Sequence, residues 1–588
     1  MRPAREEQSR KKKRRKVKKM KAAIAKLIPI AVAIVLIIAI GGIYYGRTLI
    51  ENVYYNSDRK DLRQYYELYD ENDIAVFVQN SYITEKAKYL NGACYFDMEV
   101  IEALFNNRFY VNTEEMVVMY TTQTDIYETA ISEEVSCYRV GGAEMPLENP
   151  AAVMYQDAVC ISLEFLQLFE SFSYEFYPEP NRLLLYTEKV TYPAATLTRD
   201  TNLRVLGGVK SEIVAPVAEA GEVFVLEEME KWSKVVSADG YMGYVENKML
   251  VKEGEIVKVP VEEQIADGYV PILREGKINM GFHQVFSQKA NETFDNYVSE
   301  ATGLNVIAPT WFRIVNDDGT LESIANADYV AKAHEKGIEV WAVCTDVDNS
   351  INLEAVLGVT ETRRAFIDRL VAAALEYNLD GINIDLETVK AETGSDYVQF
   401  LRELSIQTHA NGLVLSVDNY APTASTEHYG RAEQGLVADY VVVMGYDEHW
   451  GGSDVAGSVA SIDFVEGGIQ RTIAAGVAPE KLINAIPFYT RLWKTEGGVV
   501  SSEALGMNAA KKWVDENGVD LIWDNATCQY YGEAQIGGAY YQIWIEEEES
   551  IQTKLNVMQS NQVAGVAAWK LGFEKPEIWQ IIYAYQNS

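Results

Sequence analysis

The stretch DGINIDLE, residues 380–387, sets three polar side chains at every second position of an apolar run. On a β-strand alternate residues face opposite sides, so Asn383, Asp385 and Glu387 share one face, opposite to three aliphatic side chains. Buried carboxylates are costly unless they are paired, so packing alone does not favour this pattern. The stretch therefore predicts an inward-facing strand that carries functional groups to the open end of a barrel.

The surrounding sequence alternates between short apolar runs and longer amphipathic segments, from residue 277 to residue 588. The eight apolar runs are 278–282, 304–309, 338–344, 380–387, 413–418, 440–447, 482–488 and 563–569. Eight such strands with helical crossovers predict an α/β fold, a TIM or (β/α)8 barrel, over residues 277–588. The gap before the eighth run is too long for one helix, so we expect a small α+β insertion at residues 495–560.

The spacing of the two carboxylates constrains the chemistry. Asp385 and Glu387 are two residues apart, which separates them by about 6.5–7 Å along a strand backbone. This overlaps the separation of an inverting pair, but both side chains rise from one strand and face the same side of a bound sugar. The alternative is attack by the substrate's own 2-acetamido oxygen, with Glu387 protonating the leaving oxygen and Asp385 orienting the acetamido nitrogen. The neighbouring carboxylate is expected to raise the pKa of Glu387.

The stretch 380–387 resembles the D-G-x-x-x-D-x-E signature of glycoside hydrolase family 18, in which the substrate assists its own hydrolysis. The segment MGYD at 444–447 resembles the sixth-strand motif of that family, and the eighth run ends in a Trp as the family's does. The resemblance implies that Glu387 is the general acid, that Asp385 and Tyr446 bind the acetamido group, and that Trp569 floors the cleavage subsite. Asn383 stands where many chitinases have Asp, which implies a different pH profile.

Four further segments resemble the branch of the family that includes spore-cortex-lytic N-acetylglucosaminidases: PTWF at 309–312, SVD at 416–418, YDEH at 446–449 and PFYTR at 487–491. They contain further candidates for substrate binding near strand ends, which are Trp311, Asp418, Asp447, Tyr489 and Arg491. Loop-stabilising contacts are the alternative role for these five. Asn383 belongs to the same set, as a support of the site more than as a direct contact. No metal or other cofactor is expected, because the five His show no H-x-x-x-H or H-E-x-x-H pattern.

The N-terminus combines a basic run with an apolar one. Residues 1–26 contain 13 Lys or Arg against two acids, and residues 27–45 carry no charge. This pattern predicts a transmembrane helix at 27–45, a cytoplasmic tail at 1–26 and an extracellular body. Cleavage as a signal peptide, which would release a secreted protein, is the alternative. The whole chain carries a net charge of −34, so its body is strongly acidic and a nucleic-acid partner is not expected.

Two smaller modules are predicted between the apolar run and the barrel. In residues 51–190, FDMEVI at 96–101 matches ISLEFL at 161–166, which indicates an α+β repeat of a short helix and a strand pair. This module resembles the repeat found at the N-terminus of some copper amine oxidases. Residues 193–252 resemble a bacterial SH3-like domain, because a turn at 239–240 leads into an aromatic strand. Residues 253–275 are expected to form an acidic linker.

These features together predict a membrane-anchored, extracellular glycoside hydrolase. The expected reaction is cleavage of β-1,4 bonds in a glycan that contains N-acetylglucosamine, with peptidoglycan as the first candidate. A chitinase or an endo-β-N-acetylglucosaminidase on other glycans would use the same chemistry. A non-catalytic, glycan-binding scaffold of the cell wall is the competing class, and an adhesion protein that works through residues 51–190 is a third.

Overall fold

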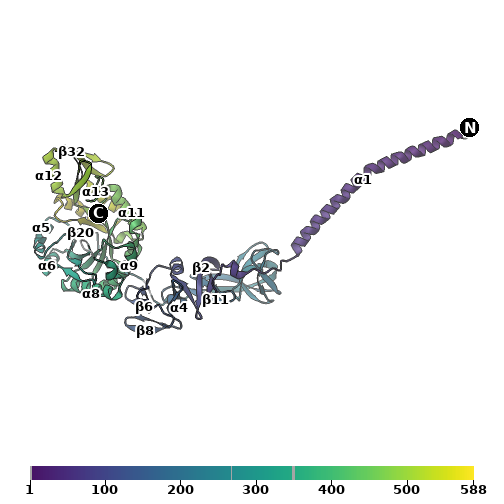
Figure 1. Ribbon diagram of the computed structural model, residues 1–588, viewed down its shortest axis with the longest axis horizontal. Helices are drawn as coiled ribbons and strands as arrows, with labels where there is room; N and C mark the ends of the chain where they lie inside the picture. The colour runs from purple at the N-terminus through teal and green to yellow at the C-terminus, as the bar shows by residue number, and fades with distance from the viewer. Residues whose placement is uncertain (1–2, 266–267, 347–350) are drawn as a thin grey trace. The chain divides into compact units, whose positions relative to one another are not determined.

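The computed structural model describes residues 3–265, 268–346 and 351–588. They form two compact units (Figure 1), of which one contains the chain up to Val100 together with Leu166–Gln264. The other contains Ile101–Phe165 and Ile265–Ser588. Two residues of the predicted tail (1–2) and two of the predicted linker (266–267) lie outside the described residues.

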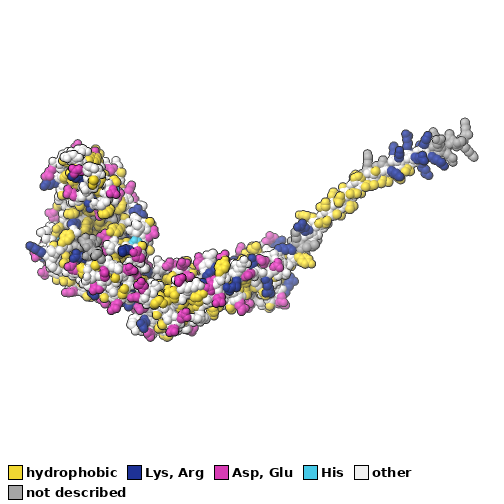
Figure 2. Space-filling view, viewed as in Figure 1, with side chains coloured by type: hydrophobic (Ala, Val, Ile, Leu, Met, Phe, Trp, Pro, Cys, Tyr) yellow, Lys and Arg dark blue, Asp and Glu magenta, His cyan; other side chains and the backbone are white. Residues whose placement is uncertain are grey.

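Helix α1 (Pro3–Val53) contains both the basic and the apolar run of the N-terminus. Figure 2 shows Lys and Arg side chains along its first part and hydrophobic side chains along the part that follows. The segment Leu27–Arg47 is long and apolar enough to cross a membrane, by length and composition, and none of it is buried. A signal sequence has the same length and composition, so the predicted anchor stays a prediction.

The first unit contains two sheets. One has the strand order β11-β12-β1-β2-β3, with β1 paired parallel to β12 and antiparallel to β2. The other is seven-stranded in the order β15-β14-β18-β17-β16-β13-β19, and it covers the region predicted to be SH3-like. The elements are α2 (Leu62–Tyr65), β1 (Asp73–Val78), β2 (Ser81–Leu90), β3 (Ala93–Asp97), β11 (Ser173–Tyr177), β12 (Arg182–Tyr186), β13 (Val190–Leu197), β14 (Thr201–Arg204), β15 (Ile213–Val217), β16 (Glu222–Glu228), β17 (Trp232–Ser237), β18 (Met242–Glu246) and β19 (Leu250–Lys258).

The two segments predicted to be copies of a repeat each contain a short helix followed by an antiparallel strand pair. Helix α3 (Met98–Leu104) leads to the antiparallel strands β4 (Phe109–Asn112) and β5 (Val117–Thr121), and helix α4 (Leu163–Leu166) leads to β11 and β12. Asp97 accepts the Val100 N–H at 2.9 Å, and Ser162 accepts the Phe165 N–H at 3.1 Å, so each copy caps its helix. The copies nevertheless belong to different units, so residues 51–190 do not form one compact module. The resemblances to copper amine oxidases and to SH3-like domains stay predictions.

The second unit contains a closed barrel of eight parallel strands, which confirms the predicted TIM barrel. Each strand coincides with one of the eight apolar runs, and the pairing of β20 with β34 and of β21 with β24 closes the ring. The strands are β20 (Ile278–His283), β21 (Val306–Pro309), β24 (Glu339–Thr345), β25 (Gly381–Asp385), β26 (Val414–Tyr420), β27 (Tyr440–Met444), β28 (Leu482–Pro487) and β34 (Gly565–Trp569).

Alternate residues of the barrel strands pack into two separate cores. The inner core contains strand residues only, such as Met280, Trp341 and Val442. The outer core joins the other face of the strands to the helices, and it contains Ile382 and Ile384 together with Leu386 just beyond β25. The helices are α5 (Phe294–Val298), α6 (Ala327–Glu335), α7 (Leu353–Leu357), α8 (Thr360–Glu376), α9 (Gly394–Ala410), α10 (Arg431–Val437), α11 (Ile462–Ala474), α13 (Glu548–Ser560) and α14 (Glu577–Gln586). The polar residues of β25 therefore face the barrel interior, as the alternation predicts.

Two additions to the barrel lie near its strand ends. A hairpin of β22 (Phe312–Ile314) and β23 (Leu321–Ser323) follows β21. A five-stranded antiparallel sheet in the order β30-β29-β33-β32-β31 follows β28, with helix α12 (Met507–Asn517). Its strands are β29 (Tyr489–Glu496), β30 (Val499–Gly506), β31 (Leu521–Asp524), β32 (Gln529–Ile536) and β33 (Ala539–Ile545). The insertion thus begins and ends earlier than 495–560, because α13 packs on β28 and β34 as a helix of the barrel.

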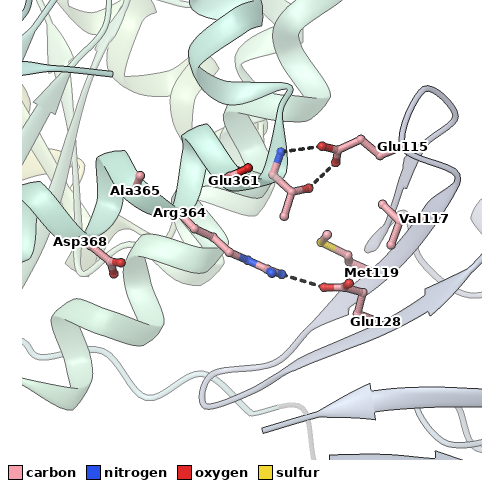
Figure 3. A pocket seen from close by; sticks show the side chains of 9 residues that line it. Glu115, Val117, Met119, Glu128, Glu361, Arg364, Ala365 and Asp368 are labelled. Carbon is pink, nitrogen blue, oxygen red and sulfur yellow. Dashed lines mark hydrogen bonds and ion pairs between the residues drawn. The ribbon is translucent and has the colours of Figure 1, made fainter. Parts of the chain in front are cut away.

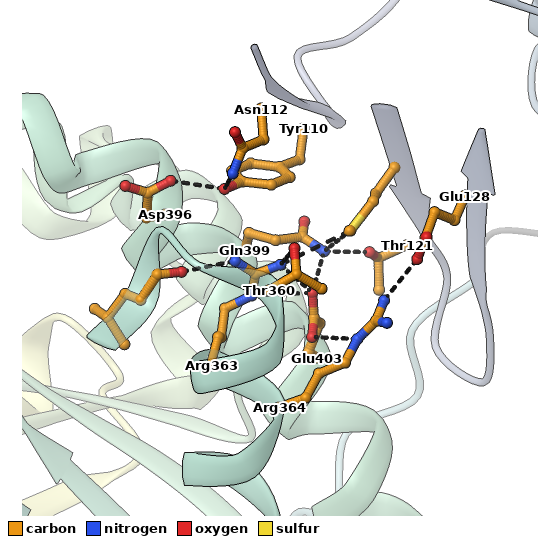
Figure 4. A network of polar contacts seen from close by, with 12 residues as sticks. Tyr110, Asn112, Thr121, Glu128, Thr360, Arg363, Arg364, Asp396, Gln399 and Glu403 are labelled. Atoms are coloured by element: carbon orange, nitrogen blue, oxygen red, sulfur yellow. Dashed lines mark hydrogen bonds and ion pairs between the residues drawn. The ribbon is translucent and has the colours of Figure 1, made fainter. Parts of the chain in front are cut away.

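Residues 101–165 also belong to this unit, through a second antiparallel sheet. Its strands are β4, β5, β6 (Ile126–Ala130), β7 (Cys137–Val140) and β8 (Ala143–Pro146), and a hairpin of β9 (Ala152–Tyr155) and β10 (Ala158–Ser162) follows. Figure 4 shows the network of polar side chains by which β5 and β6 meet α8 and α9. At its centre Arg363 Nη2 lies 2.9 Å from Glu403 Oε1, and both side chains are fully buried. A cavity of about 610 Å³ lies beside this network (Figure 3).

The segment predicted to be a linker, residues 253–275, contributes to both units. Its first residues extend β19, and after the boundary between the units the chain packs on the barrel. Tyr269 accepts a hydrogen bond of 2.9 Å from Arg108, the Ile272 N–H donates to Asp439, and Arg274 pairs with Glu339 at 2.7 Å.

Candidate active site

Strand β25 carries the polar face toward the open end of the barrel. Its first residue is Gly381, where a side chain would lie 2.7 Å from the Val414 carbonyl oxygen and 2.9 Å from the Trp341 ring. Only glycine fits there, because the inner core fills that level with the Trp341 side chain. Above it Asn383 is fully buried, and its amide donates to Ser416 Oγ at 2.9 Å and to Asp418 Oδ1 at 2.8 Å. Asn383 therefore supports Asp418 and lies beneath the site.

Glu387 follows the strand and is held through its backbone. The Glu387 N–H donates to Asp346 Oδ1 at 2.8 Å, and the Thr388 N–H donates to Asp346 Oδ2 at 3.1 Å. Asp346 is fully buried just after β24, so it fixes the chain where β25 ends. The Glu387 carboxylate itself accepts the hydroxyl of Tyr420, the last residue of β26. Two neighbouring strands thus orient this side chain.

The carboxyl groups of the site favour their protonated forms. Burial, followed by the charges of Asp418, Glu387 and Asp346, raises the pKa of Asp385 well above its ordinary value. Burial also raises the pKa of Glu387, although the hydrogen bond from Tyr420 opposes this shift. Burial raises the pKa of Asp418 to about 8, against the lowering effect of the Asn383 amide. A proton donor is therefore available in this cluster near neutral pH.

Two cavities meet at the carboxylates, one of about 160 Å³ and one of about 280 Å³. Asp385, Glu387 and Trp569 line both of them. The smaller cavity is also lined by Phe282, Asp418, Tyr420, Met444, Tyr446 and Asp447. Six of the predicted site residues are thus brought together around it. Asp385 Oδ1 is buried there and has no hydrogen-bond partner among the described residues, which leaves an acceptor for a donor on a ligand.

The remaining predicted residues lie at greater remove from the carboxylates. Trp311 is only 1% exposed and donates its indole N–H to Asn291 at 2.8 Å, so packing accounts for most of its surface although it borders the larger cavity. Tyr489 donates to Asp447 Oδ1 at 2.5 Å. Arg491 donates to Ser502 Oγ at 3.0 Å. These contacts favour a loop-stabilising role for Tyr489 and Arg491, and substrate binding by them stays a prediction.

Two residues of the site were missed in the sequence. Tyr420 stands two positions after Asp418, so the alternation that links Asn383, Asp385 and Glu387 also links these two. Asp346 stands two positions after the third apolar run, at the barrel end where the chemistry was expected. Both signals were readable from the positions of the strands. No group of three or more His, Cys, Asp or Glu among the described residues is arranged to hold a metal ion.

Comparison with known proteins agrees with this geometry. Residues 262–574 match the family model described as glycosyl hydrolases family 18. This chain belongs to that family. It is a glycoside hydrolase of the chitinase or glycosylase type, and enzymes of this family act on N-acetylated glycans.

Its curated relatives include proteins of spore-forming bacteria. The chain is 26% identical over 308 residues to the glycosylase YvbX of Bacillus subtilis, which covers 49% of this chain and 87% of that protein. It is 26% identical over 280 residues to the cortical fragment-lytic enzyme of Bacillus anthracis, over 45% of this chain and 64% of that enzyme. The chain therefore spans less than two thirds of that enzyme. The crystal structure of the spore cortex-lytic enzyme SleL of Bacillus cereus matches with a TM-score of 0.48 and 23% identity, over 52% of this chain and 73% of that chain.

Proposed function

We propose that this family member is a membrane-anchored enzyme that faces away from the cytoplasm and cleaves the β-1,4 bond after N-acetylglucosamine in a cell-wall glycan. The observation that carries the proposal is the arrangement of Asp385 and Glu387. Both rise at the end of one strand into one cleft, and one buried oxygen of Asp385 accepts no hydrogen bond from residues 3–265, 268–346 or 351–588. The cortical fragment-lytic relatives and the apolar segment of α1 support the wall substrate and the anchor.

In the proposed reaction the substrate supplies the nucleophile. Asp385 accepts the acetamido N–H, and the hydroxyl of Tyr446 donates to the acetamido carbonyl, which aims the carbonyl oxygen at the anomeric carbon. Glu387 protonates the glycosidic oxygen as that bond breaks, and the ring of Trp569 supports the sugar. A water molecule activated by Glu387 then opens the intermediate with retention of configuration. No second carboxylate on the far face of the sugar is needed.

The test is digestion of purified cell walls by the full chain, followed by identification of the new reducing ends. N-acetylglucosamine at these ends supports the proposal. In Glu387→Gln the loss of the acid is expected to lower turnover by about 10²–10⁴-fold while glycan binding is kept. Glu376→Gln, an exposed change at the end of the helix that precedes β25, is the matched control and is expected to keep full turnover.

Two other outcomes separate the alternatives. Release of products from chitin with no attack on walls would assign the same chemistry to a chitinase, an activity named for the Drosophila melanogaster relative, which is 22% identical over 258 residues. Binding of walls without new reducing ends, in both the native chain and Glu387→Gln, would favour a non-catalytic scaffold.

A further inference from the structure

A lysine, Lys570, lies next to a residue that lines the larger cavity of the cleft. Lys570 follows Trp569 directly at the end of β34, and its Nζ donates to Gln284 Oε1. Gln284 follows β20 and lines the cavity of about 280 Å³ together with Glu387 and Trp569. The ammonium group of Lys570 thus contacts a side chain that lines the cavity, although Lys570 is not itself a lining residue.

The charge of this lysine is not balanced by any carboxylate in the part of the chain that the structure describes. Among the described residues no carboxylate lies within ion-pair distance of it, and its nearest ring is that of Phe573, 4.5 Å from Nζ. Burial lowers the pKa of Lys570, which shows that its surroundings do not favour the cation. Burial and the Lys570 charge also lower the pKa of His283 to about 4.

Arg313, a cation that lines the larger cavity, differs from Lys570 in having a carboxylate partner. It is paired with Glu322 across the hairpin of β22 and β23. Its charge is already neutralised. Partly buried cations in proteins are normally paired, so an unpaired one beside a ligand cavity indicates that the ligand supplies the anion.

We propose that Lys570 and Gln284 form a subsite that recognises a carboxylate on the glycan, so that the preferred substrate is an acidic N-acetylated glycan and not a neutral polymer of N-acetylglucosamine. The inference rests on the proposed function and specifies its substrate. The carboxylate can belong to a lactyl ether on a sugar ring or to a peptide attached to that ether. Lys570 donates to it in either case, and Gln284 rotates its amide N–H toward the second oxygen.

The test measures binding, so that it is independent of turnover. The full chain with Glu387→Gln is titrated with three versions of one wall oligosaccharide: with a free lactyl carboxylate, with that carboxyl reduced to an alcohol, and with the peptide attached. A charge-assisted hydrogen bond at a partly exposed site gives about tenfold tighter binding of an acid than of its matched alcohol. The lactyl and peptide versions then show which carboxylate is recognised.

Four substitutions in the same background locate the effect. Gln284→Glu is nearly isosteric and gives Lys570 an internal carboxylate, so the tenfold preference is expected to disappear while the alcohol binds as before. Lys570→Met is expected to do the same, whereas Lys570→Arg keeps the charge and most of the preference. Lys575→Met is the control, because this nearby lysine already has a carboxylate partner, Glu548, at 3.5 Å.

The outcomes are distinguishable from those of the proposed function. Equal binding of acid and alcohol by the Glu387→Gln chain overturns the subsite, even if walls are digested. A preference that survives both Gln284→Glu and Lys570→Met overturns the assignment to these residues. A preference that follows the charge of Lys570 supports the subsite, even if the native chain produces no new reducing ends and the hydrolase proposal fails.

Discussion

The second unit contains two clusters of buried acids, and they differ in whether their carboxylates are paired with arginine side chains. Beneath α8 and α9, Glu403 lies 2.9 Å from Arg363, and Glu433 lies 2.8 Å from Arg402 and 3.3 Å from Arg108. At the barrel mouth Asp385, Glu387 and Asp418 form no ion pair with any described residue. Their contacts are the neutral donors Asn383 and Tyr420 and the neighbouring carboxylates.

The presence or absence of a cation partner distinguishes buried acids with a structural role from those with a functional role. A buried acid paired with arginine stabilises the packing of a sheet on helices, and it is not free to give or take a proton. A buried acid without a cation is costly, and it persists where a ligand or a reaction uses it. Substitutions in the two clusters are therefore expected to have opposite effects on stability and activity.

The largest effect is expected from Arg363→Met. This change leaves Glu403 buried with its closest cation removed, and loss of one partner of a buried pair costs about 3–5 kcal/mol of unfolding free energy. Turnover per folded molecule should not change, because Arg363 lies outside the cleft. Chemical denaturation measures the first and an assay at low temperature the second. Arg139→Met, which removes an exposed pair with Glu144, is the control and should leave stability unchanged. Native-like stability of Arg363→Met would contradict the comparison.

The next effect is expected from Asp385→Asn in the cleft. Unlike the carboxyl group, the amide cannot lose a proton and carry a negative charge as positive charge develops on the acetamido group, so turnover should fall about 100-fold, which corresponds to about 2.7 kcal/mol. Stability should hold or rise, since one of three adjacent acids is removed. Parallel measurement of kcat and of the denaturation midpoint checks both. A loss of stability equal to that of Arg363→Met would show that Asp385 is a packing residue and not a functional one.

The barrel and its catalytic strand were predictable because their signal is local. Each of the eight strands is a short apolar run, and the alternation in 380–387 identified the inward face. The smaller cavity contains Asp385, Glu387, Asp418, Tyr446, Asp447 and Trp569, all named from motifs or strand ends.

The contacts between segments distant in sequence were not predictable. Nothing in residues 101–165 indicates that Arg108 and Met119 lie against α8 and α9, because these contacts join residues more than 240 positions apart. The same holds for the split of the repeat between two units. Trp311 borders the larger cavity, but its motif does not show that its indole N–H would donate to a buried acceptor, Asn291, from another segment.

A third prediction concerns Asp418→Asn, which should stabilise the protein. The folded chain holds the Asp418 proton up to a pH of about 8, whereas the ordinary pKa is 3.8. The folded state therefore binds more protons than the unfolded state in this interval, and the free energy of unfolding falls as pH rises through it. The amide of the variant does not titrate, so its free energy of unfolding does not fall in this way. Relative to the native chain, the variant should therefore gain about 1–2 kcal/mol of unfolding free energy at pH 8 and little at pH 4. Denaturation at both values tests this, and an equal gain at both would refute the assignment.

The smallest effect is expected from Tyr420→Phe, which removes one hydrogen bond and keeps the ring. The hydroxyl donates to Glu387 and lowers the pKa of that carboxyl, in opposition to burial. Without this hydrogen bond the pKa of Glu387 rises further. Turnover requires protonated Glu387, so the alkaline limb of the pH–rate profile should move to higher pH.

This shift distinguishes two roles of the tyrosine. If Tyr420 only packs beside the acid, Phe replaces it and both limbs of the profile stay where they are. If it sets the protonation of Glu387, the alkaline limb moves while the denaturation midpoint does not. Tyr429→Phe is the matched control, because its hydroxyl donates to the backbone carbonyl of Glu387 at 3.0 Å and not to the carboxylate. A shift of equal size in both variants would place the effect in the loop and not in the hydrogen bond to the acid.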